Sequence, residues 1–158
     1  MPSIFDRVRL NPAQLRTVAE RRFADAECLR KTGDNERANG AMYLGGFVIE
    51  CLLKARLLEE HPWLQTPLSP HPSPEEQRLW SLCYRSHDLN EILERLPGLT
   101  RELAEQDRRE GQRTSRLEML KRICTEWTIQ ARYSPRSETM AHANQFLDRI
   151  RELKAWLK

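Results

Sequence analysis

The sequence predicts an all-α protein, an antiparallel up-and-down bundle of four long helices with one or two short extra helices. Three observations support this class: apolar residues recur at spacings of three and four, no segment alternates at period two, and only six of the 158 residues are glycine. A composition of 39% hydrophobic and 31% charged residues suits amphipathic helices around one core. Because this length fits one domain, we expect residues 1–158 to form a single helical domain.

The first half of the chain predicts two long helices and a loop. Asn11 suits an N-cap because a proline follows it at the first helical position, and this helix should end near Gly33. Asp34 can cap the second helix, which is apolar around most of its circumference over residues 41–58 and is therefore expected to be buried at the centre. The proline-rich stretch 61–74 predicts an irregular connection within the same bundle.

The second half contains further capping signals. Ser73 and the proline and acids after it predict a third helix that breaks near Ser86, because acidic side chains favour the positive end of a helix dipole. Asp88 can cap a short helix, which Pro97 and Gly98 are expected to stop.

Two more segments complete the predicted bundle. Residues 99–127 have helical spacing with a break expected at Gly111. Ser134 and Pro135 then interrupt the chain before a last helix over residues 140–157, in which apolar residues mark one face.

Charge and cysteine content narrow the function classes. The net charge is only +3 with acids and bases interleaved, so bulk charge predicts no partner, although arginine predominates over lysine and suits phosphate contacts. Cys28, Cys51, Cys83 and Cys124 form no CxxC pair and lie among apolar residues, which predicts buried, reduced thiols. The opening MPSIFDRVRL has no apolar signal segment and no stretch approaches 18 apolar residues, so we expect a cytoplasmic protein without a membrane span.

Familiar enzyme signatures do not occur in the sequence. It contains no GxGxxG, Walker, HExxH or GxSxG motif, and its four histidines lie in separate segments. We therefore expect neither a metal site nor a cofactor.

One polar stripe interrupts the apolar second helix. Asn39, Tyr43, Gly46, Glu50 and Lys54 follow one another at steps of three or four and so share a face. One interpretation is a local Glu50–Lys54 ion pair with the Tyr43 hydroxyl donating nearby. The other is a groove beside this helix that receives a ligand, an RNA segment or a second subunit.

The adjacent glycines Gly45 and Gly46 indicate close packing. Each costs a helix roughly 1 kcal/mol relative to alanine, so a neighbouring backbone is expected to approach there. That neighbour could belong to the same chain or to the second subunit of a homodimer.

Three sequence elements in the right order resemble the HEPN family. AMYLGGFVIECLLKA, at residues 41–55, resembles the "aG..iE..LKA" helix of HEPN domains. HDL, beginning at His87, resembles their "HdL" element, and ARYSP, at residues 131–135, resembles their "aRYp" element. The resemblance extends over roughly residues 38 to 135, and the terminal helix completes the same plan.

The resemblance implies a helical bundle that commonly dimerises and is often encoded beside a minimal nucleotidyltransferase in toxin-antitoxin or defence systems. Some members are metal-independent endoribonucleases with an Arg-x4-6-His motif, and others act as binding modules. We expect a noncatalytic, homodimeric module that binds RNA, a nucleotide or a nucleotidyltransferase-type protein. A metal-independent endoribonuclease and a structural helical adaptor are the alternatives.

The Arg-x4-6-His spacing occurs twice, at Arg56 with His61 and at Arg136 with His142. The first pair ends the second helix, away from the family's position for this motif, whereas the second opens the last helix at approximately the right place. As the resemblance implies, His142 would act as acid or base and Arg136 would stabilise phosphate charge across a dimer cleft. The alternative is that both are surface residues at a helix start.

The remaining candidates are residues that would bind a ligand or partner. They are Tyr43, Glu50, Lys54, His87, Asp88, Arg132 and Tyr133. His87 either supports the helix cap beside Asp88 or points into the groove. Arg132 either closes the bundle by pairing with Glu50 or joins Lys54 and His87 in an anion site.

Overall fold

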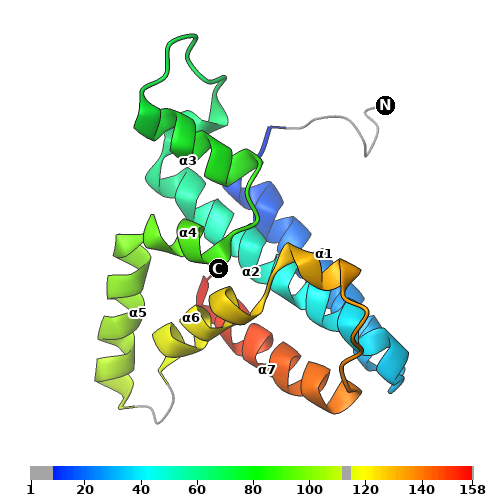
Figure 1. Ribbon diagram of the computed structural model, residues 1–158. Helices are drawn as coiled ribbons and strands as arrows, with labels where there is room; N and C mark the ends of the chain where they lie inside the picture. The colour runs from blue at the N-terminus through cyan, green and yellow to red at the C-terminus, as the bar shows by residue number, and fades with distance from the viewer. Residues whose placement is uncertain (1–8, 112–114, 158) are drawn as a thin grey trace.

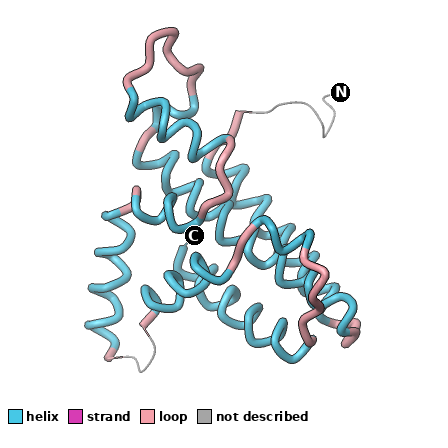
Figure 2. Tube along the Cα trace, viewed as in Figure 1, coloured by secondary structure: helices cyan, strands magenta, loops and turns pink. Residues whose placement is uncertain are grey.

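The residues that the computed structural model describes, 9–111 and 115–157, form helices joined by loops (Figures 1 and 2). No strand occurs in these residues, which confirms the all-α class. The α-helices are α1 (Pro12–Arg30), α2 (Ala38–Glu60), α3 (Pro74–Tyr84), α4 (Leu89–Glu94), α5 (Pro97–Glu110), α6 (Arg116–Glu126) and α7 (Met140–Leu157). Short 3-10 segments are η1 (Asn35–Arg37), η2 (Pro62–Gln65) and η3 (Ile129–Tyr133). Residues 1–8, most of the opening segment discussed above, lie outside the described residues.

Helix α2 runs through the centre of the molecule, with α1 packed along it and α7 crossing against it (Figure 1). Its buried side chains extend from Ala38 to Leu58, so the predicted central helix is confirmed. At Gly45 a Cβ atom would lie 2.7 Å from Cδ2 of Leu147, so this glycine permits the close approach of α7. None of the described helices, α2 included, combines the length and apolarity that a membrane span requires.

Three of the predicted helix starts are confirmed by their capping bonds. The Asn11 side chain accepts a 2.9 Å bond from the backbone N–H of Gln14, and Ser73 forms a reciprocal capping box with Glu76. Asp88 accepts a 3.0 Å bond from the backbone N–H of Glu91 at the start of α4. Each bond links residues only three positions apart, which explains why the sequence could predict it.

Two predicted boundaries are corrected. Helix α4 ends at Glu94, and Pro97 and Gly98 form the first turn of α5 instead of stopping a helix. The first turn of a helix tolerates proline because its missing N–H would have no partner there. Asp34 caps the 3-10 segment η1, and α2 follows directly from it.

The predicted helix over residues 99–127 consists of α5 and α6. Gly111 ends α5 in the left-handed conformation, with φ of 57°, so the break expected there is confirmed. Figure 1 shows α5 at the edge of the molecule, where it contacts α4 and α6. Because this segment is divided into two shorter helices, the described helices of 18 residues or more are α1, α2 and α7.

The cysteines follow the predicted burial with one exception. Cys51, Cys83 and Cys124 are buried, but Cys28 is exposed on α1. Burial raises the pKa of the Cys51 and Cys124 thiols to about 12 and that of Cys83 to about 11. The prediction was wrong for Cys28 because its apolar neighbours in sequence lie on another face of α1.

We expect a thiol reagent at pH 8 to modify native Cys28 rapidly and the three buried cysteines only after unfolding. Access is blocked at the buried positions, and their raised pKa leaves almost no reactive thiolate. Mass spectrometry of peptides labelled with and without guanidinium measures this. A Cys28→Ser variant is the control and should take up no reagent while folded, whereas fast labelling of native Cys51 would contradict the packing of α2.

Candidate functional site

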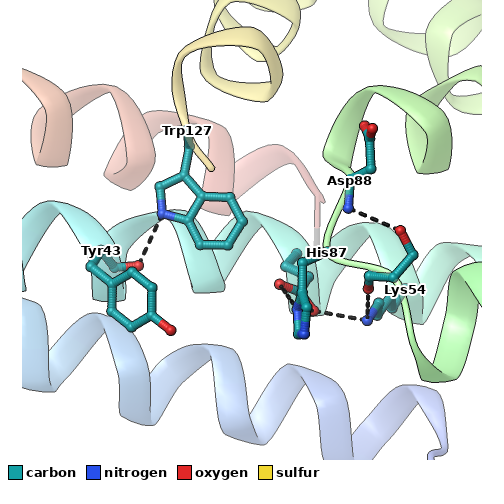
Figure 3. Close-up of polar contacts among 7 residues, drawn as sticks. Tyr43, Lys54, His87, Asp88 and Trp127 are labelled. Carbon is teal, nitrogen blue, oxygen red and sulfur yellow. Dashed lines mark hydrogen bonds and ion pairs between the residues drawn. The ribbon is translucent and has the colours of Figure 1, made fainter. Parts of the chain in front are cut away.

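Glu50 lies at the centre of a buried charge cluster on α2. Its side chain is 5% exposed, and its Oε1 accepts a 2.8 Å hydrogen bond from Nζ of Lys54, one helical turn further along. The same Nζ donates to the carbonyl oxygen of Ser86 at 2.8 Å (Figure 3). The expected Glu50–Lys54 ion pair is therefore present, and the loop between α3 and α4 covers it.

His87 completes this cluster from the α3–α4 loop. Its Nδ1 lies 3.0 Å from both carboxylate oxygens of Glu50. Its ring packs edge-on against the ring of Phe47, with the two centroids 6.0 Å apart. Because an ionised carboxylate only accepts, Nδ1 carries the proton and donates it. Nε2 has no hydrogen-bond partner among the described residues, and the side chain is 41% exposed. Glu50 thus holds one ring nitrogen and leaves the other available.

Asp88 and His87 have different roles although they are adjacent. Asp88 caps α4, and its backbone N–H donates to Oγ of Ser86 at 3.1 Å. Of the two roles expected for His87, the structure shows the one that faces Glu50 and Lys54 (Figure 3). The helix cap is therefore provided by Asp88 alone, and His87 is the exposed end of the buried cluster.

Gly46 provides the space for Trp127, which docks the chain after α6 onto α2. A Cβ atom at Gly46 would lie 2.0 Å from Cδ1 and Nε1 of this indole. The indole N–H donates to the carbonyl oxygen of Tyr43 at 3.2 Å, and the two rings stack with centroids 6.1 Å apart (Figure 3). The neighbour at Gly46 is thus a side chain of the same chain and not the backbone that the sequence predicted, so Gly46 offers no surface to a second subunit.

The sequence predicted that Tyr43 would join the ion pair, but in the structure it does not. Its interactions with described residues are the ring contacts with Phe47 and Trp127 and the bond that its carbonyl accepts. Its hydroxyl forms no hydrogen bond with Glu50 or Lys54, and its ring stacks on that of Trp127. Tyr43 therefore supports the packing of the chain that follows α6.

Arg132 and Tyr133 lie on the surface, in η3. The guanidinium carbon of Arg132 lies 4.6 Å from the centroid of the Tyr133 ring, and this ring is 68% exposed. The predicted Arg132–Glu50 pair is therefore wrong, since Lys54 and His87 occupy the carboxylate. The predicted anion site of Arg132, Lys54 and His87 is wrong for the same reason: two of its members bind Glu50.

Arg136 and His142 lie near the start of α7 without forming a pair within the chain. His142 Nδ1 lies 2.7 Å from Oε2 of Glu138, one turn earlier. Asn39 on α2 holds the intervening loop by donating to the Arg136 carbonyl at 2.7 Å and accepting from the Glu138 N–H at 2.9 Å. The Arg136 guanidinium contacts no carboxylate among the described residues, so it remains available to a ligand. In the other pair with this spacing, Arg56 engages Glu102 at 3.8 Å.

Two adjoining hollows lie along the segment after α6. The first, of about 300 Å³, is lined by His87, Asn90 and Trp127, among others. The second, of about 360 Å³, is lined by Asn39 and Arg136, among others. Thr128 and Gln130 line both, so the two hollows adjoin one another along the chain that follows Trp127. We call the two hollows together the η3 groove.

Several residues of the η3 groove were not among the predicted site residues. In the sequence Trp127 is only the last residue of the predicted helical segment 99–127, and its partner Gly46 is the one signal that indicates its role. Asn90 directly follows the HDL element and Gln130 directly precedes the ARYSP element, but neither residue belongs to its element, so the sequence did not mark them. Among the described residues, no cluster of three or more His, Cys, Asp or Glu side chains could hold a metal ion.

The three sequence elements that resemble those of HEPN domains lie together in the structure. Glu50 and Lys54 come from the first element, His87 from the second, and η3, which contains most of the third, packs against α2. Comparison with family models, with curated proteins and with solved structures finds no match.

Proposed function

We propose that this chain is a HEPN-like helical module that forms a homodimer, catalyses no reaction itself and binds RNA. The observation that carries the proposal is that all three elements of the resemblance meet along α2 and line the two adjoining hollows of the η3 groove. Glu50 and Lys54 hold His87 at one end of it, and Trp127 docks η3 along its length. We also propose that the helices form an antiparallel up-and-down bundle of four long helices.

The exposed polar side chains of the η3 groove support RNA as its ligand. The groove is edged by hydroxyl and amide side chains, of which Thr128, Gln130 and Asn90 are exposed. Arg136 adds one guanidinium without an acidic partner among the described residues. Exposed amides and arginine suit base edges and phosphate.

The cellular setting is part of the same proposal. We place the protein in the cytoplasm and in a toxin-antitoxin or defence-like system, as the resemblance implies. The four free cysteines support a reducing compartment.

We expect the purified protein to bind a fluorescein-labelled single-stranded RNA, with affinity that falls as salt rises from about 50 to about 200 mM. Fluorescence anisotropy measures binding, and sedimentation velocity at high micromolar concentration measures the oligomeric state. An Arg136→Ala variant should bind less tightly, since it loses a phosphate contact, while an Arg21→Ala variant on the far α1 surface serves as control. A monomer without affinity for RNA would overturn the proposal.

One contact favours a second candidate, a metal-independent endoribonuclease. Glu138 holds Nδ1 of His142 and leaves Nε2 for proton transfer, which is the arrangement that a general base requires. Arg136 from the second subunit would then have to reach the same phosphate.

Incubating total cellular RNA with the protein and EDTA separates these two functions. We expect the RNA to stay intact with both the native protein and a His142→Ala variant. If the native protein cleaves the RNA and the variant does not, the protein is an endoribonuclease and not a noncatalytic module.

A further inference from the structure

The hollow beside His87 has an apolar floor and a polar rim. Leu89, Cys124 and Trp127 lie buried at its base, whereas Asn90, Gln130 and His87 are exposed around it. Its volume of about 300 Å³ is at the small end of the range for ligand pockets. The hollow therefore suits a small, flat ring with hydrogen-bonding edges.

Unused hydrogen-bonding groups surround this hollow. The side-chain amide of Gln130 has no hydrogen bond to a described residue, and Oδ1 of Asn90 accepts only a 3.5 Å bond from Thr125. Glu50 fixes Nδ1 of His87 as the donor, so in the neutral ring Nε2 is an acceptor. An amide presents a donor and an acceptor side by side, which matches the edges of nucleobases.

The charges around the hollow favour an uncharged ring over a phosphate. No lysine or arginine lines it, and Asp88 adds a carboxylate. The guanidinium of Arg136 lies in the adjoining hollow instead, and the two share Thr128 and Gln130. The two acids of that second hollow are engaged, Glu126 by Arg122 and Arg149, and Glu138 by His142. A base beside His87 would thus meet hydrogen-bonding side chains, and a phosphate near Arg136 would meet a guanidinium.

We propose that the hollow formed by His87, Asn90 and Gln130 receives one unstacked base of a single-stranded RNA. The inference rests on the proposed function, because it names the part of the RNA that the η3 groove recognises. The amides of Asn90 and Gln130 bind the edge of the base, and His87 is a positioning residue held by Glu50. The strand continues past Thr128, so that Arg136 meets its backbone.

The test compares two strands of about 12 nucleotides, a length within the range that single-stranded sites cover. One is a fluorescein-labelled RNA of mixed sequence, and the other is a matched strand in which the central nucleotides are abasic. The variant Asn90→Ala/Gln130→Ala removes both amides at exposed positions, and Asn144→Ala/Gln145→Ala on α7 is the matched control. Circular dichroism verifies that both variants are folded.

We expect the native protein and the control to bind the mixed strand about tenfold more tightly than the abasic strand. The Asn90→Ala/Gln130→Ala variant should bind both strands with the same, weaker affinity. If this variant still distinguishes the strands as the native protein does, the base site is overturned while RNA binding stands. If the native protein binds neither strand, the RNA-binding function is overturned and the base site with it.

Discussion

Replacing Gly46 with alanine is expected to lower the free energy of unfolding by about 3 kcal/mol, the upper end for inserting a methyl group into a packed core. The new Cβ would lie 2.0 Å from the Trp127 indole, so this side chain would have to move. The indole has little room, because it is 6% exposed, bonded to the Tyr43 carbonyl and in ring contact with Phe47. Chemical denaturation of the native and variant proteins measures the difference.

Gly40→Ala is the matched control for this prediction. A Cβ at Gly40 would lie 3.2 Å from Cδ1 of Leu29, the flexible end of a side chain that can adjust. Alanine also favours a helix by roughly 1 kcal/mol over glycine, so the control should be neutral or more stable. Equal stability of the two variants would mean that Trp127 does not pack on Gly46.

The Gly46 substitution should also weaken RNA binding, because Trp127 docks the chain that forms the η3 groove. A double-mutant cycle with Trp127→Ala separates the steric clash from other effects of the methyl group. Without the indole, Gly46→Ala should cost little or become favourable. If its cost is unchanged in the Trp127→Ala background, the clash is not its cause.

Replacing Glu50 with alanine is expected to destabilise the protein by about 3 to 5 kcal/mol. The Lys54 ammonium would remain 8% exposed with the Ser86 carbonyl as its one hydrogen-bond acceptor among described residues, and His87 would lose its anchor. Most of the cost arises from leaving a buried charge without its counter-charge. Urea unfolding followed by circular dichroism measures the effect.

Two controls test whether burial is the cause. Glu59 also pairs with a cation, Arg16 at 2.7 Å, but it is 39% exposed, so Glu59→Ala should cost less than about 1 kcal/mol. The double variant Glu50→Leu/Lys54→Met removes both charges and should recover much of the stability lost in Glu50→Ala. A Glu50→Ala protein as stable as Glu59→Ala would show that the cluster contributes nothing by being buried.

Local signals in the sequence were sufficient for most of the helices. Asn11, Ser73 and Asp88 cap helices through bonds to residues three positions ahead, and Gly111 ends a helix through its own backbone conformation. The ion pair of Glu50 with Lys54 belongs to the same class, because residues four apart on a helix face one another. The error at Pro97 arose because proline suits both the end of one helix and the first turn of the next.

The site depended on contacts that no local pattern records. The sequence by itself determined the all-α class, the buried central helix and a polar stripe on that helix that included Glu50. Only the tertiary structure decided that His87, and not Arg132, meets Glu50, that Trp127 fills the space at Gly46, and that a groove lies along η3. Helix caps and periodicity depend on neighbours within one turn, whereas these contacts depend on how the chain returns to α2 after α3 and α6, which the packing of the whole core determines.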